Sequence, residues 1–95
     1  MINIKFQKNK ITVSGHSGYA PPGKDIVCSA ISVLTETFIA SVEALTGDEI
    51  KSDIRSGEAV ITYDNLSENG TLLIESFFIG ARGVAQSYPK YVNII

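Results

Sequence analysis

Residues 15–32 read GHSGYAPPGKDIVCSAIS, and this stretch leads from a loop into a long helix. Three glycines and two prolines between Gly15 and Lys24 predict the loop, because neither residue type continues a strand or opens a helix early. Asp25 is the expected N-cap, since its carboxylate can accept hydrogen bonds from the free N–H groups of the first turn. Apolar residues then recur at steps of three or four, and Gly47 is expected in the left-handed position that ends such a helix. The predicted buried stripe comprises Val27, Ile31, Leu34, Phe38, Val42 and Leu45, widened by Ile26, Ala30 and Val33.

Alternating apolar residues predict a β-hairpin on either side of this helix. The first joins strands at residues 2–6 and 11–13 through Asn9-Lys10, and the second joins residues 50–54 and 59–63. A second helix is expected after Ser67, and residues 91–95 could add a short final strand. The predicted buried face of the second helix comprises Leu73, Phe77, Ala81, Val84 and Tyr88. The order strand-strand-helix-strand-strand-helix predicts a two-layer α+β fold, with residues 1–95 forming a single domain.

The composition bears on the partners of the chain. Of its 95 residues 44% are hydrophobic and 19% are charged, so part of the surface is expected to pack against a second copy in a homodimer. The net charge is −2 and basic residues do not cluster, which argues against direct binding to nucleic acid.

The single cysteine cannot form an intramolecular disulfide and suits a reducing compartment. The N-terminus alternates like a strand rather than resembling a signal peptide. We also expect no apolar segment approaching the ~18–20 residues that cross a bilayer. These features together predict a cytoplasmic protein without membrane contact.

The same junction holds the only histidine and the only cysteine, His16 and Cys28. With Asp25 as N-cap, Cys28 occupies the third position of the helix, where exposed N–H groups and the helix dipole would stabilise a thiolate. The first-turn N–H groups could also form an oxyanion hole. His16 could act as general base toward the thiol and then as general acid toward a leaving amine. The pattern predicts a cysteine-dependent hydrolase, with Asp25 mainly a structural cap.

Other chemistries fit the stretch less well. Residues 18–24 resemble the start of a phosphate-binding loop, but Asp25 follows where a hydroxyl should reach magnesium, and prolines at 21 and 22 lack the required N–H groups. A zinc site is disfavoured because His16, Cys28 and Asp25 lack paired ligand spacing, so no metal and no cofactor are expected. Taken separately, a lone cysteine or histidine is more often structural than catalytic.

Two separated motifs resemble those of the bacterial ribosomal-processing cysteine proteases. They are Gly15-His16-Ser17 followed by Gly23-x-Asp25-Ile26-Val27-Cys28-Ser29-Ala30-Ile31-Ser32, and near the C-terminus Ala85-x-x-Tyr88-Pro89-x-Tyr91-Val92. The resemblance implies a homodimeric α+β protease that removes an N-terminal leader from the precursor of large-subunit ribosomal protein twenty-seven. It implies His16 and Cys28 as the catalytic pair and Asp25 in support. The loop residues that could contact the substrate are Gly15, Ser17, Gly18, Tyr19 and Gly23.

Two alternatives remain open from the sequence. One is a non-catalytic dimeric module for ribosome assembly, in which Cys28 only packs. The other keeps the nucleophile but transfers the acyl group to an acceptor other than water.

Overall fold

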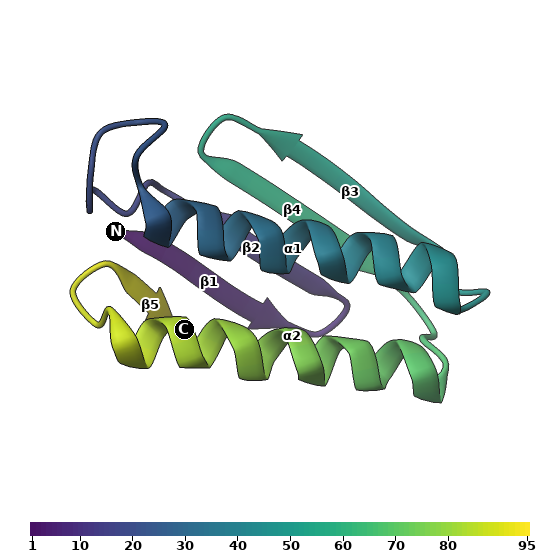
Figure 1. The fold of residues 1–95 in the computed structure, drawn as a ribbon. Helices are drawn as coiled ribbons and strands as arrows, with labels where there is room; N and C mark the ends of the chain where they lie inside the picture. The colour runs from purple at the N-terminus through teal and green to yellow at the C-terminus, as the bar shows by residue number, and fades with distance from the viewer.

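The computed structural model describes residues 1–95 as one five-stranded sheet with two helices on one face (Figure 1). The elements are β1 (Ile2–Gln7), β2 (Lys10–Ser14), α1 (Ile26–Leu45), β3 (Ile50–Arg55), β4 (Glu58–Tyr63), α2 (Glu68–Ser87) and β5 (Val92–Ile94). The predicted two-layer α+β fold is confirmed, including the short final strand.

The strands lie in the order β3-β4-β2-β1-β5. Both predicted hairpins form, and β2 also pairs antiparallel with β4, so that Ile11 lies opposite Ile61. Only β5 runs parallel to its neighbour β1. The first turn lies one residue earlier than expected, because Asn9 takes the positive φ of 61° and Lys10 already belongs to β2. The order leaves β3 at the sheet edge nearest α1 (Figure 1).

The core lies between the sheet and the two helices. Ile4, Ile11 and Ile61 are fully buried on the helix-facing side of their strands, and the stacked rings of Phe38 and Phe77 join α1 to α2 at 5.4 Å. Each such side chain contributes roughly 1.5–3 kcal/mol through the loss of its contact with water. The complete cluster comprises Ile2, Ile4, Ile11, Val27, Ile31, Phe38, Val42, Ile61, Phe77, Ala81 and Val92.

The predicted stripe of α1 is too wide. Ile26, Val33 and Leu45 are 55%, 60% and 68% exposed, because α1 packs on the sheet with one face only. Thr35 is buried instead, and its hydroxyl donates a hydrogen bond to the Ile31 carbonyl at 2.7 Å. A threonine can be buried on a helix in this way because the preceding turn supplies its partner.

The end of α1 also differs from the prediction. Gly47 is not in the left-handed region; the helix ends at Thr46 in extended conformation. The Thr46 N–H and hydroxyl both donate to the Val42 carbonyl, at 3.2 and 2.7 Å. The helix therefore ends on the backbone and side chain of Thr46 instead of on a left-handed glycine.

α1 is also more apolar than we expected. It has 20 residues, and an 18-residue window within it has a mean hydropathy of 1.6, so the helix is long and apolar enough by these two measures to cross a membrane. The expectation that no segment would reach this length was therefore wrong. The physical reason is that α1 combines a buried apolar face with an exposed one.

The glycines of α2 play different roles. A Cβ atom at Gly80 would lie 2.9 Å from Leu34 Cδ2, so this glycine makes room for a side chain of α1. Nothing lies within 4 Å of the corresponding position at Gly83. Glycines inside a helix suggest a close approach by another backbone, but no backbone atom is among the nearest contacts at either position.

Candidate active site

The Asp25 carboxylate joins the start of α1 to the preceding loop. Its Oδ1 accepts the N–H groups of Val27 and Cys28 at 3.0 and 2.9 Å, as expected of an N-cap. Its Oδ2 accepts the Ser17 hydroxyl and, at 3.4 Å, the Ala20 N–H. Asp25 makes no hydrogen bond with His16 in this arrangement, so it supports the site by holding the loop on the helix.

These hydrogen bonds change the acidity of Asp25. They lower its pKa from 3.8 to about 2, and the Ser17 hydroxyl has the largest effect. Burial acts in the opposite direction, and the N–H groups of Cys28, Ala20 and Val27 lower the pKa further. The carboxylate is therefore ionised at neutral pH and provides a fixed negative charge at the positive end of α1.

Cys28 lies half-buried in the first turn of α1, with its sulfur toward the loop. Its Sγ accepts a hydrogen bond from the Ser17 backbone N–H at 3.3 Å. The predicted position, third in the helix behind an aspartate cap, is confirmed.

His16 precedes Ser17 and is exposed at the surface of the loop. Its carbonyl accepts a hydrogen bond from the N-terminal amino group of Met1 at 2.6 Å. The Gly57 position lies beside its ring, since a Cβ atom there would be 3.0 Å from His16 Nε2. The backbone of His16 is thus held by the N-terminus, and its imidazole lies beside the turn joining β3 to β4.

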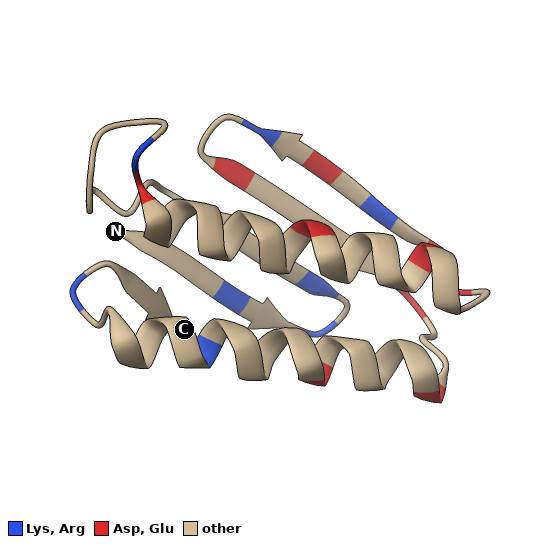
Figure 2. Ribbon diagram, viewed as in Figure 1, with Lys and Arg blue, Asp and Glu red and all other residues tan.

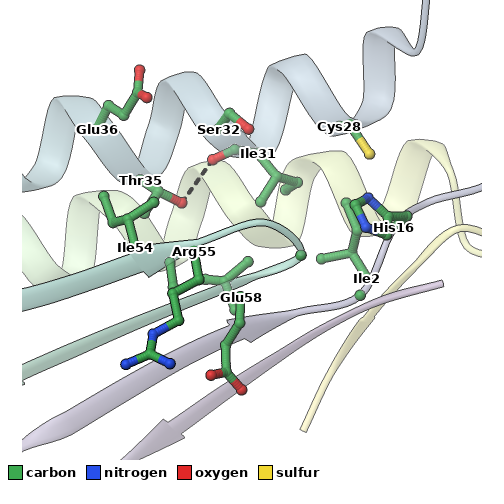
Figure 3. A pocket seen from close by; sticks show the side chains of 14 residues that line it. Ile2, His16, Cys28, Ile31, Ser32, Thr35, Glu36, Ile54, Arg55 and Glu58 are labelled. Carbon is green, nitrogen blue, oxygen red and sulfur yellow. Dashed lines mark hydrogen bonds between the residues drawn. The ribbon is translucent and has the colours of Figure 1, made fainter. Parts of the chain in front are cut away.

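Two hollows meet at His16, Cys28 and Ser32. The first, of about 190 Å³, runs along α1 toward the β3–β4 hairpin. Figure 3 shows the His16 imidazole and the Cys28 thiol at the same end of this hollow. The second, of about 650 Å³, lies on the loop side between residues 18–23 and α1. An extended chain laid across the sulfur would have room on both sides.

The loop is also held from its other side. The Tyr19 ring packs edge-on against Tyr88 and Tyr91, with ring centres 5.5 and 5.2 Å apart. Tyr19 remains 41% exposed. Aromatic pairs in this geometry contribute about 0.5–1.5 kcal/mol beyond their buried area.

The other predicted loop residues are glycines with positive φ. Gly15, Gly18 and Gly23 have φ of 92°, 72° and 84°, a region that favours glycine. Gly15 also lies so close to the Met1 carbonyl that a side chain would collide with it. Their role in the structure is to shape the loop.

One part of the predicted chemistry is wrong. We expected the first-turn N–H groups to face a substrate as an oxyanion hole. Those of Val27 and Cys28 are bound to Asp25 Oδ1, and the Ser29 N–H donates to the Asp25 carbonyl at 3.1 Å. These three donors are therefore already occupied.

Sequence reasoning missed the roles of Ser17 and Gly57. The sequence predicted Ser17 as a loop residue that could contact the substrate, yet the residue is 4% exposed, its hydroxyl binds the Asp25 cap, and its N–H reaches the sulfur. Gly57 was only part of a turn. Neither contact leaves a local signal, because residues distant along the chain make both of them. No group of three or more His, Cys, Asp or Glu side chains is placed to hold a metal ion.

Comparison with known proteins identifies the family. The family model described as cysteine protease Prp matches residues 1–93. The ribosomal processing cysteine protease Prp of Mycoplasma genitalium is 28% identical over 94 residues, which cover 99% of this chain and 94% of the relative.

Two crystal structures of the ribosomal processing protease Prp from S. aureus share the fold. The complex with a covalently linked product peptide has a TM-score of 0.89 and 15% identity, covering 98% of this chain and 94% of the other. The complex with a substrate peptide has a TM-score of 0.83 and 14% identity, covering 99% and 95%. From the family match, the chain belongs to the cysteine protease Prp family and is a cysteine protease.

Proposed function

We propose that this protease removes the N-terminal leader from the precursor of large-subunit ribosomal protein twenty-seven, with Cys28 as nucleophile and His16 as general base and acid. The observation that carries the pair is the meeting of both side chains at the junction of the two hollows. The ribosomal substrate is supported by the relatives from Mycoplasma genitalium and S. aureus, which are ribosomal processing proteases. Family membership removes the basis for the non-catalytic assembly module.

The reaction begins when His16 takes the proton from the Cys28 thiol. The thiolate then attacks the scissile carbonyl carbon, and the carbonyl π electrons move to its oxygen. When the carbonyl re-forms, the carbon–nitrogen bond breaks and His16 gives its proton to the leaving amine. A water molecule, deprotonated by His16, then hydrolyses the thioester and restores the thiol. With an amine as acceptor in place of water, the same acyl-enzyme would give transfer instead of hydrolysis.

Two hollows that meet at the sulfur support cleavage within a chain, since an endopeptidase must bind residues on both sides of the bond. The smaller hollow lies among apolar side chains, including Ile2, Val13, Ile31 and Ile54. The larger one lies between the loop, including Gly18 and Gly23, and the start of α1, including Ser29. We place the residues on either side of the scissile bond in these two hollows.

We also propose that the protein acts as a homodimer in the cytoplasm, where ribosomal proteins are made, without direct contact with nucleic acid or membrane. The outward faces of α1 and α2 carry few charges (Figure 2). Val33 on α1 and Leu72 and Ile79 on α2 are 60–62% exposed there. Sedimentation should give twice the monomer mass of 10.2 kDa for the purified protein, and a Val33→Asp variant should shift toward monomer. A purely monomeric wild-type protein would contradict the dimer.

The direct test is incubation of the purified protein with the unprocessed ribosomal precursor of its own host. Mass spectrometry should show two peptides whose masses sum to the precursor plus one water, which also separates hydrolysis from acyl transfer. His16→Ala should lower kcat by about 10²–10⁴-fold, because it removes the group that carries the proton. Its melting temperature should stay near wild type, since the ring is exposed. Unchanged cleavage by this variant would exclude His16 as the base.

A further inference from the structure

The donor that stabilises the oxyanion is not one of the occupied first-turn N–H groups. Attack by a thiolate places negative charge on the substrate oxygen, and proteases stabilise that charge with fixed hydrogen-bond donors. The N–H groups of Val27, Cys28 and Ser29 already serve Asp25. These three N–H groups are therefore not free to bind the oxyanion, and the loop beside the sulfur is the other source of donors.

The loop supplies one at the right place. The Ser17 N–H lies 3.3 Å from Sγ and approaches the sulfur from the loop rather than from the helix. We propose that this backbone N–H is an oxyanion donor of the protease, held in place by the hydrogen bond from the Ser17 hydroxyl to Asp25. The inference rests on the proposed function, because it takes Cys28 as the nucleophile.

The movement of charge during the reaction explains how one donor can serve two acceptors. Once His16 has taken the proton from the thiol, the N–H is in place to hydrogen-bond to the negatively charged Sγ. As the carbon–sulfur bond forms, that charge passes to the carbonyl oxygen, which is attached to the same carbon. An N–H already in contact with Sγ needs only a small shift to follow the charge. When the carbonyl re-forms and the amine leaves with its proton from His16, the donor is released.

The side chain of Ser17 fixes the direction of its own backbone. Its hydroxyl donates to Asp25 Oδ2 and accepts the Tyr19 N–H at 3.1 Å. The residue is 4% exposed, and Asp25 is 8% exposed. Because Asp25 also caps α1, the loop amide and the nucleophile are held by the same carboxylate. Such preorganisation is what makes an oxyanion donor effective.

The experiment compares two peptide probes, of which only one forms a tetrahedral adduct with Cys28. One is a synthetic peptide aldehyde ending at the scissile position, whose hemithioacetal with Cys28 mimics the tetrahedral intermediate. The other is the same peptide ending in an amide, which binds without reacting. Ser17→Ala removes the tether, and Ser76→Ala on the exposed face of α2 is the matched control.

For Ser17→Ala we expect kcat to fall about tenfold, KM to stay within about twofold, and the aldehyde to bind about tenfold more weakly. Binding of the peptide amide should be unchanged, and Ser76→Ala should behave as wild type throughout. Equal weakening of both probes, or kinetics identical to those of Ser76→Ala, would overturn the proposal.

If Ser17→Ala fails to fold, replacing the amide at residue 17 by an ester keeps the hydroxyl and removes only the N–H. Aldehyde binding should then weaken about a hundredfold, and full aldehyde affinity would refute the donor. Should Cys28→Ala be inactive while both Ser17 variants keep full activity, only the oxyanion assignment fails and the proposed function stands.

Discussion

The N-termini of α1 and α2 use the same capping chemistry but differ in function. At α1 the cap is Asp25, and Ser17 in the preceding loop donates to it. At α2 the cap is Ser67, which accepts the Gly70 N–H at 3.1 Å and donates to Asp48 at 2.8 Å. Each pair joins a carboxylate and a hydroxyl to satisfy the first turn.

The two helix starts differ in their third residue. At α2 it is Gly70, buried where an added side chain would collide with Asp48, so the end of that helix is closed. At α1 it is Cys28, which borders both hollows beside His16. A capped helix start therefore becomes reactive only when a nucleophile, a base and space for substrate are added to it.

The largest effect should come from the third position of α1. Cys28→Ala removes the nucleophile, so cleavage should fall at least about a thousandfold while folding is retained. At α2, Ser67→Ala should lose about 1 kcal/mol of unfolding free energy through the lost cap and keep its kcat. Cleavage assays and thermal unfolding of both variants check this. Appreciable proteolysis by Cys28→Ala would contradict the assignment.

An intermediate effect is expected from the two carboxylates. Asp25→Ala should lower the melting temperature by about 5–10 °C and also reduce kcat, because Ser17 loses its anchor. Asp48→Ala should lower the melting temperature but leave kcat within about twofold. Both should be assayed well below their melting temperatures. Equal losses of kcat would mean that Asp25 acts through stability alone.

The smallest effect should appear in the dependence of stability on pH. The folded-state pKa of Asp25 is about 2, below its ordinary 3.8, so the folded state favours the ionised form. The stabilisation is therefore fully present above about pH 4 and is lost as pH falls toward about 2. The stability difference between wild type and Asp25→Asn, measured by urea unfolding, should shrink over this range. A difference that stays constant down to pH 2 would contradict the role of the carboxylate.

Much of the fold follows from local patterns. Alternation predicted both hairpins, and Asp25 and Ser67 predicted where the helices begin, because an N-cap acts within three residues of itself. The outward side of α1 was mispredicted at Ile26, Val33 and Leu45. Periodicity measures how apolar a face is, whereas exposure depends on which neighbour covers it.

The candidate site also combines features that local sequence predicts with features that depend on tertiary structure. Local sequence by itself determined that Cys28 would stand third in a helix behind an aspartate cap, and that a flexible loop carrying His16 would precede it. Only the tertiary structure decided that the Ser17 N–H reaches the sulfur and that Gly57 lies beside the imidazole. Capping and periodicity act between residues a few positions apart. The hollow at the sulfur arises from segments that meet only when the sheet and α1 pack together.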